Sequence, residues 1–119
     1  YIDDIVEGII ALIDKAPNKK QLGKIKNDSL SPVAPFRVLN IGNTHKVYLL
    51  DFINELEKQL GKKAIRNYMA MQKGDVKMTV SDTTLLKKIT GYNPKTHYKI
   101  GIKKFLEWYL FYYKINNKY

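Results

Sequence analysis

Apolar side chains recur at helical spacing in the first stretch of the chain. The stripe runs from Ile5 to Ile13, which predicts an α-helix with one apolar face. Asp3 or Asp4 is placed to cap its start. Pro17 ends it, because proline lacks an N–H and clashes with the preceding turn.

Three further stretches show the same spacing. The clearest runs from Leu49 to Leu60, and Gly61 supplies the left-handed position after its end. A two-turn helix is predicted around residues 85–89, and a longer one carries an apolar stripe from Ile102 to Tyr113. Their expected boundaries are Ser81 or Asp82 and Gly91 for the short helix, and Thr96 for the last one. The polar tail at 116–118 is expected to fray.

Short β-rich runs alternate with these helices. Residues 36–42 predict a buried strand, 64–71 a second strand, 72–75 a turn and 78–81 a short extended piece. Residues 17–35 predict a long loop, which is uncommon in a compact domain unless it is functional or ordered by other parts. We therefore expect an α/β fold, or an α+β-like fragment, of three main helices with a few short strands.

Composition changes this picture only slightly. The chain has 119 residues, a net charge of +10 and no cysteine, which excludes disulfides and thiolate chemistry. No apolar run approaches the roughly 18 residues needed to span a bilayer, so a cytoplasmic protein is expected. The basic excess is almost all lysine, scattered along every segment, whereas base-reading interfaces rely on bidentate arginine. Nucleic-acid binding is thus disfavoured.

Four stretches, in order, carry a more specific signal. They are Tyr1-Ile2-Asp3-Asp4-Ile5-Val6-Glu7-Gly8-Ile9, Ala34-Pro35-Phe36-Arg37-Val38-Leu39-Asn40-Ile41-Gly42-Asn43, Met71-Gln72-Lys73-Gly74-Asp75-Val76, and Gly101-Ile102-Lys103-Lys104-Phe105-Leu106-Glu107-Trp108-Tyr109. Together they resemble the C-terminal third of the nucleotide-sugar epimerases of the extended short-chain dehydrogenase/reductase family. The likeness is greatest to the UDP-glucuronate 4-epimerases of surface polysaccharide pathways, which also carry an insertion where residues 17–35 lie.

This resemblance implies that residues 1–119 are a C-terminal UDP-sugar-binding segment. The N-terminal Rossmann domain, which holds NAD and the catalytic Tyr-x-x-x-Lys pair in the family, is absent from this chain. Neither a closely spaced glycine-rich turn nor a tyrosine followed four residues later by lysine occurs here. We therefore expect no catalytic residue, cofactor site or metal site on this chain, and no turnover by it alone.

The expected substrate-binding residues are Gln72, Gly74 and Asp75. By resemblance, Asp75 accepts hydrogen bonds from the uridine ribose and Gln72 faces the pyrophosphate, while Gly74 lets the backbone turn close to the ligand. Galactose-type relatives carry arginine at the Gln72 position. From the residues alone, Gln-Lys-Gly-Asp favours a plain β-turn. The order of the family motifs around it favours the ligand-binding role instead.

Other candidate residues have ordinary explanations. The isolated histidines, His45 and His97, are expected to face solvent or to pack, and the acidic residues near Asp3 favour a helix start rather than a metal. The aromatic residues from Trp108 to Tyr113 fall at helical spacing and predict core or interface contacts rather than base stacking.

The function expected is that of the sugar-nucleotide side of an NAD-dependent epimerase that interconverts UDP-glucuronate and UDP-galacturonate. Its expected partners are the UDP-sugar, its own N-terminal domain and a second subunit in a homodimer. Dehydratase and decarboxylase relatives stay open, because residues outside this chain decide the reaction. The alternative is a free-standing basic interaction module that binds nucleic acid or protein.

Overall fold

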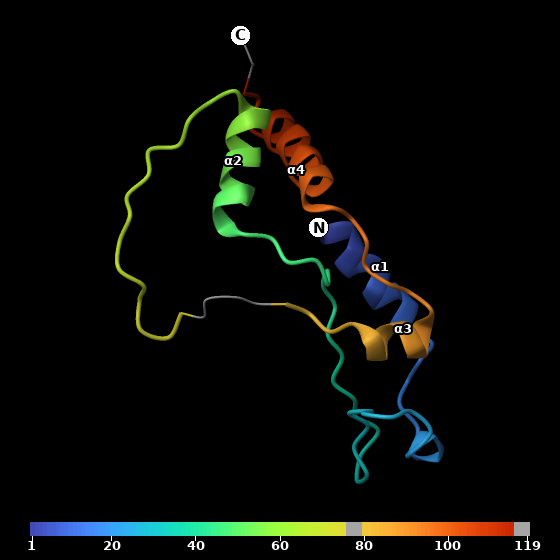
Figure 1. Ribbon diagram of the computed structural model, residues 1–119. Coiled ribbons are helices and arrows are strands. Elements are labelled where there is room, and N and C mark those ends of the chain that lie inside the picture. Colours follow the sequence, from blue (N-terminus) through green and yellow to red (C-terminus); the bar gives the residue numbers. More distant parts are fainter. Residues whose placement is uncertain (76–79, 116–119) are drawn as a thin grey trace. The chain divides into compact units, whose positions relative to one another are not determined.

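The computed structural model describes residues 1–75 and 80–115, and these form helices joined by long irregular segments (Figure 1). The α-helices are α1 (Ile2–Leu12), α2 (Leu49–Leu60), α3 (Thr84–Thr90) and α4 (Tyr98–Tyr112), with a short 3₁₀ turn, η1 (Lys19–Gln21). The four predicted helices are therefore present. The expected fraying at 116–118 lies outside the described residues.

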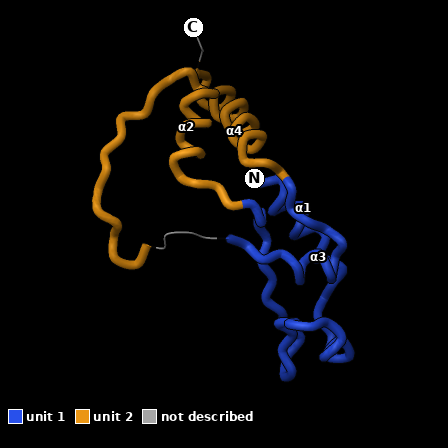
Figure 2. Tube along the Cα trace, viewed as in Figure 1, with its two compact units in different colours: residues 1–45, 80–95 blue, residues 46–79, 96–119 orange. Residues whose placement is uncertain are grey.

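The chain divides into two compact units, each built from two separate stretches of sequence (Figure 2). Unit 1 comprises residues 1–45 and 80–95 and contains α1, η1 and α3. Unit 2 comprises residues 46–79 and 96–119 and contains α2 and α4.

In unit 1, α1 packs against α3 and the segments that flank them. Leu86 on α3 is completely buried, and the Tyr92 hydroxyl donates a hydrogen bond to the Asp4 carbonyl at 3.1 Å. Gly8 allows close approach, because a Cβ atom there would lie 2.9 Å from Cγ2 of Ile41. The absence of a side chain at Gly8 thus lets Ile41 lie close against α1.

In unit 2, α2 packs against α4. Ile102 and Leu106 of α4 are buried, as their apolar stripe predicts. The Gln59 side chain donates to the Lys99 carbonyl at 3.1 Å, and the rings of Phe52 and Tyr98 stack with centroids 6.4 Å apart. Polar and aromatic contacts therefore join the same two helices.

The helix ends agree only partly with the expected caps. Gly61 and Gly91 follow α2 and α3 in the left-handed conformation, as predicted. The cap predicted at Thr96 is wrong: His97 precedes α4, and its Nδ1 accepts a hydrogen bond from the Lys99 N–H. His97 thus has a local structural role.

The long loop at 17–35 is ordered by contacts within unit 1. Arg37 forms a bidentate ion pair with Asp28, at 2.9 Å from both Nε and Nη2, and donates to Gln21 at 3.1 Å. Asn18 and Gln21 form a reciprocal capping box at η1. The path of the loop is therefore held at these points by contacts within unit 1.

The predicted α/β fold is wrong for the part of the chain that the structure describes, which contains helices and no strand. Residues 36–42 and 64–71 lack strand pairing, and the piece predicted at 78–81 lies partly outside the described residues. A strand needs a neighbouring backbone for its N–H and C=O groups. Within 36–42, the Ser29 hydroxyl bonds both the N–H and the carbonyl of Val38 instead. The β-rich patterns thus predict extended backbone but not a sheet.

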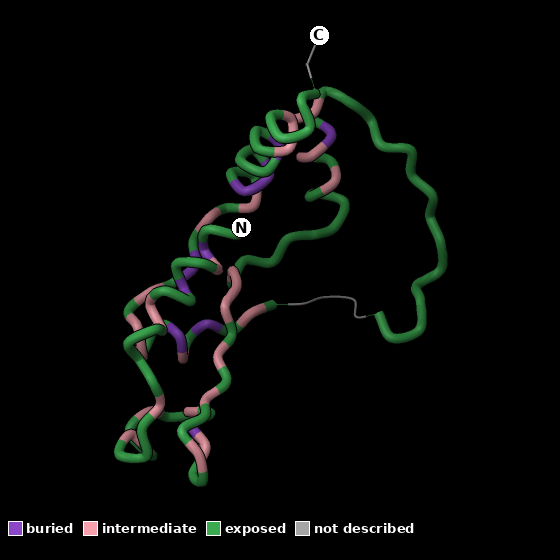
Figure 3. Tube along the Cα trace, turned by 180° about the vertical axis from the view of Figure 1, so that it is seen from behind, coloured by how far each residue is buried: buried purple, intermediate pink, exposed green. Residues whose placement is uncertain are grey.

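Little apolar surface is buried (Figure 3). The buried hydrophobic residues among those described are Leu30, Leu86, Ile102 and Leu106. By contrast, four isoleucines of the first segment are more than half exposed: Ile2, Ile9, Ile10 and Ile13. Of the predicted stripe, Ile9 and Ile13 are thus exposed, whereas Ile5 and Leu12 are half-buried. In the described residues, each helix falls short of the length and apolar character that crossing a bilayer requires.

Candidate functional site

The three predicted site residues lie on one β-turn of unit 2. The Asp75 N–H donates to the Gln72 carbonyl at 3.2 Å, which closes the turn over residues 72–75. Gly74 adopts a φ of +96°, a conformation that strains residues with a Cβ atom. No atom lies within 4 Å of an added Cβ there, so the backbone angle rather than crowding favours glycine.

All three of these residues are exposed. The turn therefore offers a carboxylate that accepts hydrogen bonds, an amide that both donates and accepts, and the neighbouring Lys73 cation. An exposed carboxylate of this kind suits a pair of vicinal hydroxyl groups. One exposed turn forms only one wall of a ligand site. Val76, the last residue of the recognised motif, lies outside the described residues.

The segment that leads to this turn is fixed at its start by Glu57 of α2. Its carboxylate accepts hydrogen bonds from Lys63 at 3.0 Å, from the Ala64 N–H at 3.0 Å and from Arg66 at 2.8 Å. Hydrogen bonds from Lys63 and Arg66, and then from the Ala64 amide, lower the pKa of Glu57 to about 2. Arg66 also donates to the Asn54 side chain at 2.7 Å. The chain is therefore held to α2 as far as residue 66.

Beyond residue 66 the segment is exposed as far as the turn, and it makes no backbone hydrogen bond to the described residues up to residue 71. The side chains of Tyr68, Met69 and Met71 are each at least 60% exposed. Within the part of the chain that the structure describes, the apolar residues of this segment are thus largely exposed.

Neither Glu57 nor Arg66 was among the site residues expected from the sequence. A signal was present: Glu57 comes one helical turn after Ile53 and one turn before Leu60 of the apolar stripe, so it lies on the same side of α2. Two basic residues, Lys63 and Arg66, come soon after the helix ends at Gly61. A carboxylate beside a helix stripe, followed by cations beyond the C-terminus, predicts a clamp of this kind.

The other candidates of the sequence analysis have local contacts. His45 contacts the Asn43 side chain through Nδ1 at 2.8 Å, and Asp4 is buried next to Tyr92. The rings of Trp108 and Tyr112 stack with centroids 5.4 Å apart on α4, and both remain more than half exposed. These aromatics form an exposed surface as well as intrahelical contacts.

Comparison with known proteins gives close relatives over nearly the whole chain. Protein CapI from Staphylococcus aureus is 43% identical over 116 residues, which are 96% of this chain and 34% of that protein. A probable UDP-glucuronate 4-epimerase from Rhizobium meliloti is 40% identical over 92% of this chain and 33% of its own length. UDP-glucuronate 4-epimerase 4 from Arabidopsis thaliana is 40% identical over 99% of this chain and 26% of its own length.

No family model matches the sequence. The chain spans about a third or less of these relatives, and the matched region is their C-terminal part. The resemblance inferred from the four motifs is thereby confirmed.

Proposed function

Since the chain is homologous to the C-terminal part of UDP-glucuronate 4-epimerases and CapI, we propose that it forms the sugar-nucleotide side of such an epimerase. The observation that carries the proposal is the near-complete coverage of this chain by relatives at 36–43% identity. The exposed turn at 72–75 supports it, because it presents Gln72 and Asp75 together at a point where a ligand has access.

In this proposal, Asp75 accepts hydrogen bonds from the ribose hydroxyls of the uridine group. Gln72 lies nearer the pyrophosphate and contributes its amide donor without a positive charge. Gly74 permits the left-handed turn that sets these two side chains on the same short segment. Lys73, between them, adds a cation that favours the anionic ligand.

The chemistry of the whole protein belongs to parts that this chain does not include. A polypeptide about three times longer, with an upstream Rossmann domain that binds NAD, would oxidise C4 of the sugar and return the hydride to the opposite face. We propose UDP-glucuronate and UDP-galacturonate as the substrate pair, surface polysaccharide synthesis as the role, the cytoplasm as the location and a homodimer as the assembly. This chain alone would be inactive.

The test uses the full-length protein that contains this chain. The purified protein is incubated with UDP-glucuronate, and the sugar protons are followed by NMR without added NAD. Signals of UDP-galacturonate are expected, because epimerases of this kind hold their nicotinamide tightly. Absence of conversion, together with absence of a co-purifying nucleotide, would contradict the proposal and favour the basic interaction module. Salt-sensitive binding of random single-stranded DNA would then support that alternative.

A further inference from the structure

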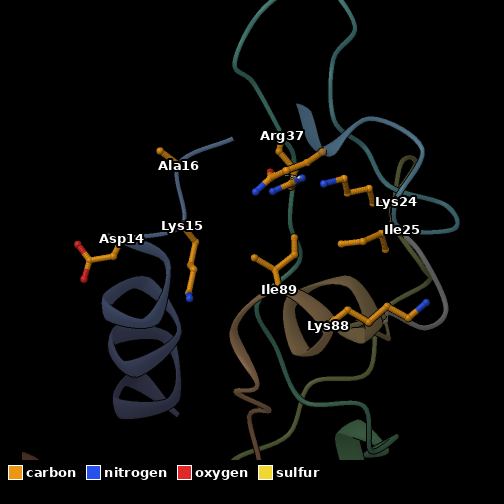
Figure 4. Close-up of a pocket in the computed structure, with 9 residues that line it drawn as sticks. Asp14, Lys15, Ala16, Lys24, Ile25, Arg37, Lys88 and Ile89 are labelled. Carbon is orange, nitrogen blue, oxygen red and sulfur yellow. Dashed lines mark hydrogen bonds between the residues drawn. The ribbon is translucent and has the colours of Figure 1, made fainter. Parts of the chain in front are cut away.

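Unit 1 contains a cavity of about 500 Å³ that the proposed substrate turn does not share (Figure 4). It lies between the end of the first helical segment, the loop at 17–35, residue 37 and the end of α3. Its charged lining consists of Asp14, Lys15, Lys24, Arg37 and Lys88. The volume falls within the usual range of small-molecule sites.

Arg37 is the fixed element of this cavity. Its side chain is only 3% exposed, and its Nε and Nη2 atoms are engaged by Asp28 and Gln21. Gln21 is itself held by the capping box at η1. Among the described residues, these bonds engage Nε and Nη2 of Arg37, and none of them uses Nη1. Arg37 lines the cavity, so the Nη1 donors of a guanidinium already held in position are the ones left for a ligand.

Lys24 adds a second cation to the lining of the cavity. Figure 4 shows its amino group directed toward the guanidinium of Arg37, whereas the Asp14 carboxylate is directed away from it. Lys15 and Lys88 also line the cavity. The residues that line the cavity carry four cations and one carboxylate, Asp14, while Asp28 outside the lining pairs with Arg37. The lining is therefore net positive and favours an anion.

The cavity also has an apolar side, formed by Ile25 and Ile89. A ligand that fills it would therefore carry a compact anionic group at Arg37 and Lys24 and a small carbon portion against the isoleucines. Guanidinium groups bind phosphate oxygens through parallel N–H bonds, and lysine supplies a point charge beside them.

We propose that this cavity binds a phosphate group, with Arg37 and Lys24 as its ligands. The site is independent of the turn at 72–75, because all of its residues belong to unit 1. Two kinds of ligand carry such a group: free phosphate and a small organic phosphate ester.

The experiment is an NMR titration of the ¹⁵N-labelled chain with inorganic phosphate and, separately, with phenyl phosphate, at ionic strength held constant with chloride. A saturable shift of the Arg37 Nε–H signal is expected with both probes. Tighter binding of phenyl phosphate would identify an organic phosphate as the ligand, since the isoleucines then contact its carbon portion. Equal affinity would identify free phosphate. Shifts that do not saturate with either probe would overturn the proposal.

Two lysines of the same loop make a matched pair of variants. Lys24→Ala should weaken phosphate binding about tenfold, because a charge-assisted contact is lost. Lys26→Ala removes the same charge two residues away, from an exposed side chain that does not line the cavity, and should leave the affinity within about twofold. Equal weakening by both variants would show general attraction to a basic chain and would overturn the site. Asp75→Asn should leave phosphate binding unchanged, so failure of the substrate turn would remain distinguishable from failure of this cavity.

Discussion

The Arg66 guanidinium donates two hydrogen bonds to the Glu57 carboxylate, at 2.8 Å from Nη2 and 3.3 Å from Nε. The same carboxylate oxygen also accepts the Ala64 N–H. One buried side chain of α2 thus fixes the path of the segment that leads to the candidate site. The direction in which this segment leaves the helix depends on a single charged group.

Acid should release this segment. Because the pKa of Glu57 is lowered to about 2 from 4.5, its ionised form stabilises the folded arrangement fully above pH 4.5. That contribution is lost as the pH falls from 4.5 through the folded-state value near 2. Hydrogen exchange at the Ala64 amide should therefore accelerate in this window beyond the intrinsic pH effect, and Glu57→Gln should abolish the transition.

A control for this measurement is Glu107→Gln. Glu107 pairs with Lys103 at 3.9 Å, but both side chains are largely exposed. The pair therefore contributes little to the free energy of unfolding. The Ala64 exchange profile should be the same as in the unsubstituted chain. An unchanged profile in Glu57→Gln would show that the clamp does not hold the segment.

Asp75→Asn should weaken binding of the UDP-sugar to the full-length protein about tenfold, because a charged hydrogen-bond acceptor is replaced by a neutral one. Asp75 is exposed, so the free energy of unfolding should change by less than about 0.5 kcal/mol. Isothermal titration calorimetry and urea denaturation measure the two effects. Asp51→Asn, at an exposed carboxylate of α2, is the matched control and should retain full affinity. Equal affinities for the two variants would remove Asp75 from the site.

Leu86→Ala should lower the free energy of unfolding of unit 1 by about 2–4 kcal/mol, because it deletes a completely buried side chain and leaves a cavity. Val33→Ala, in the same unit, removes apolar atoms from a residue that is 80% exposed. This substitution should change the free energy of unfolding by less than about 0.5 kcal/mol. Urea denaturation followed by circular dichroism checks both values. Similar losses in the two variants would contradict the packing described for α3.

The exposed isoleucine face of α1 should make the isolated chain bind hydrophobic dyes and self-associate. Ile9→Lys should reduce both effects, because it places a charge within this apolar face. Dye fluorescence and sedimentation velocity measure them. Thr44→Lys adds the same charge at an exposed polar position of unit 1 and should change neither. Full-length protein that binds dye as strongly as the isolated chain would show that this face stays open there.

Local patterns in the sequence predicted the helices well, because helical hydrogen bonds form within one segment. The apolar stripe from Leu49 to Leu60 predicted the bounds of α2, and Gly61 predicted the left-handed cap that follows it. The strands at 36–42 and 64–71 were predicted wrongly, because strand formation depends on a neighbouring backbone that the pattern of one segment does not reveal.

The candidate site was predicted in part. Gln72, Gly74 and Asp75 lie together on one turn, as their adjacency requires, while their role as ligands remains a prediction. The pair of Asp28 and Arg37 was missed, because their contact spans a loop whose course depends on tertiary structure. The clamp at Glu57 was also missed, although a carboxylate on the packed side of α2 followed by cations beyond Gly61 was a local signal for it.

The alternation of the two units along the sequence has a consequence for synthesis. Unit 1 is completed only when residues 80–95 join residues 1–45, and unit 2 only when residues 96–119 join residues 46–79. During synthesis, α1 lacks its packing partner α3, and α2 lacks α4, until the later helix has left the ribosome. Neither unit can therefore complete its packing until most of the chain has emerged. A stop codon before residue 80 would leave both units incomplete. A stop codon just after residue 95 would leave unit 1 complete and unit 2 without residues 96–119.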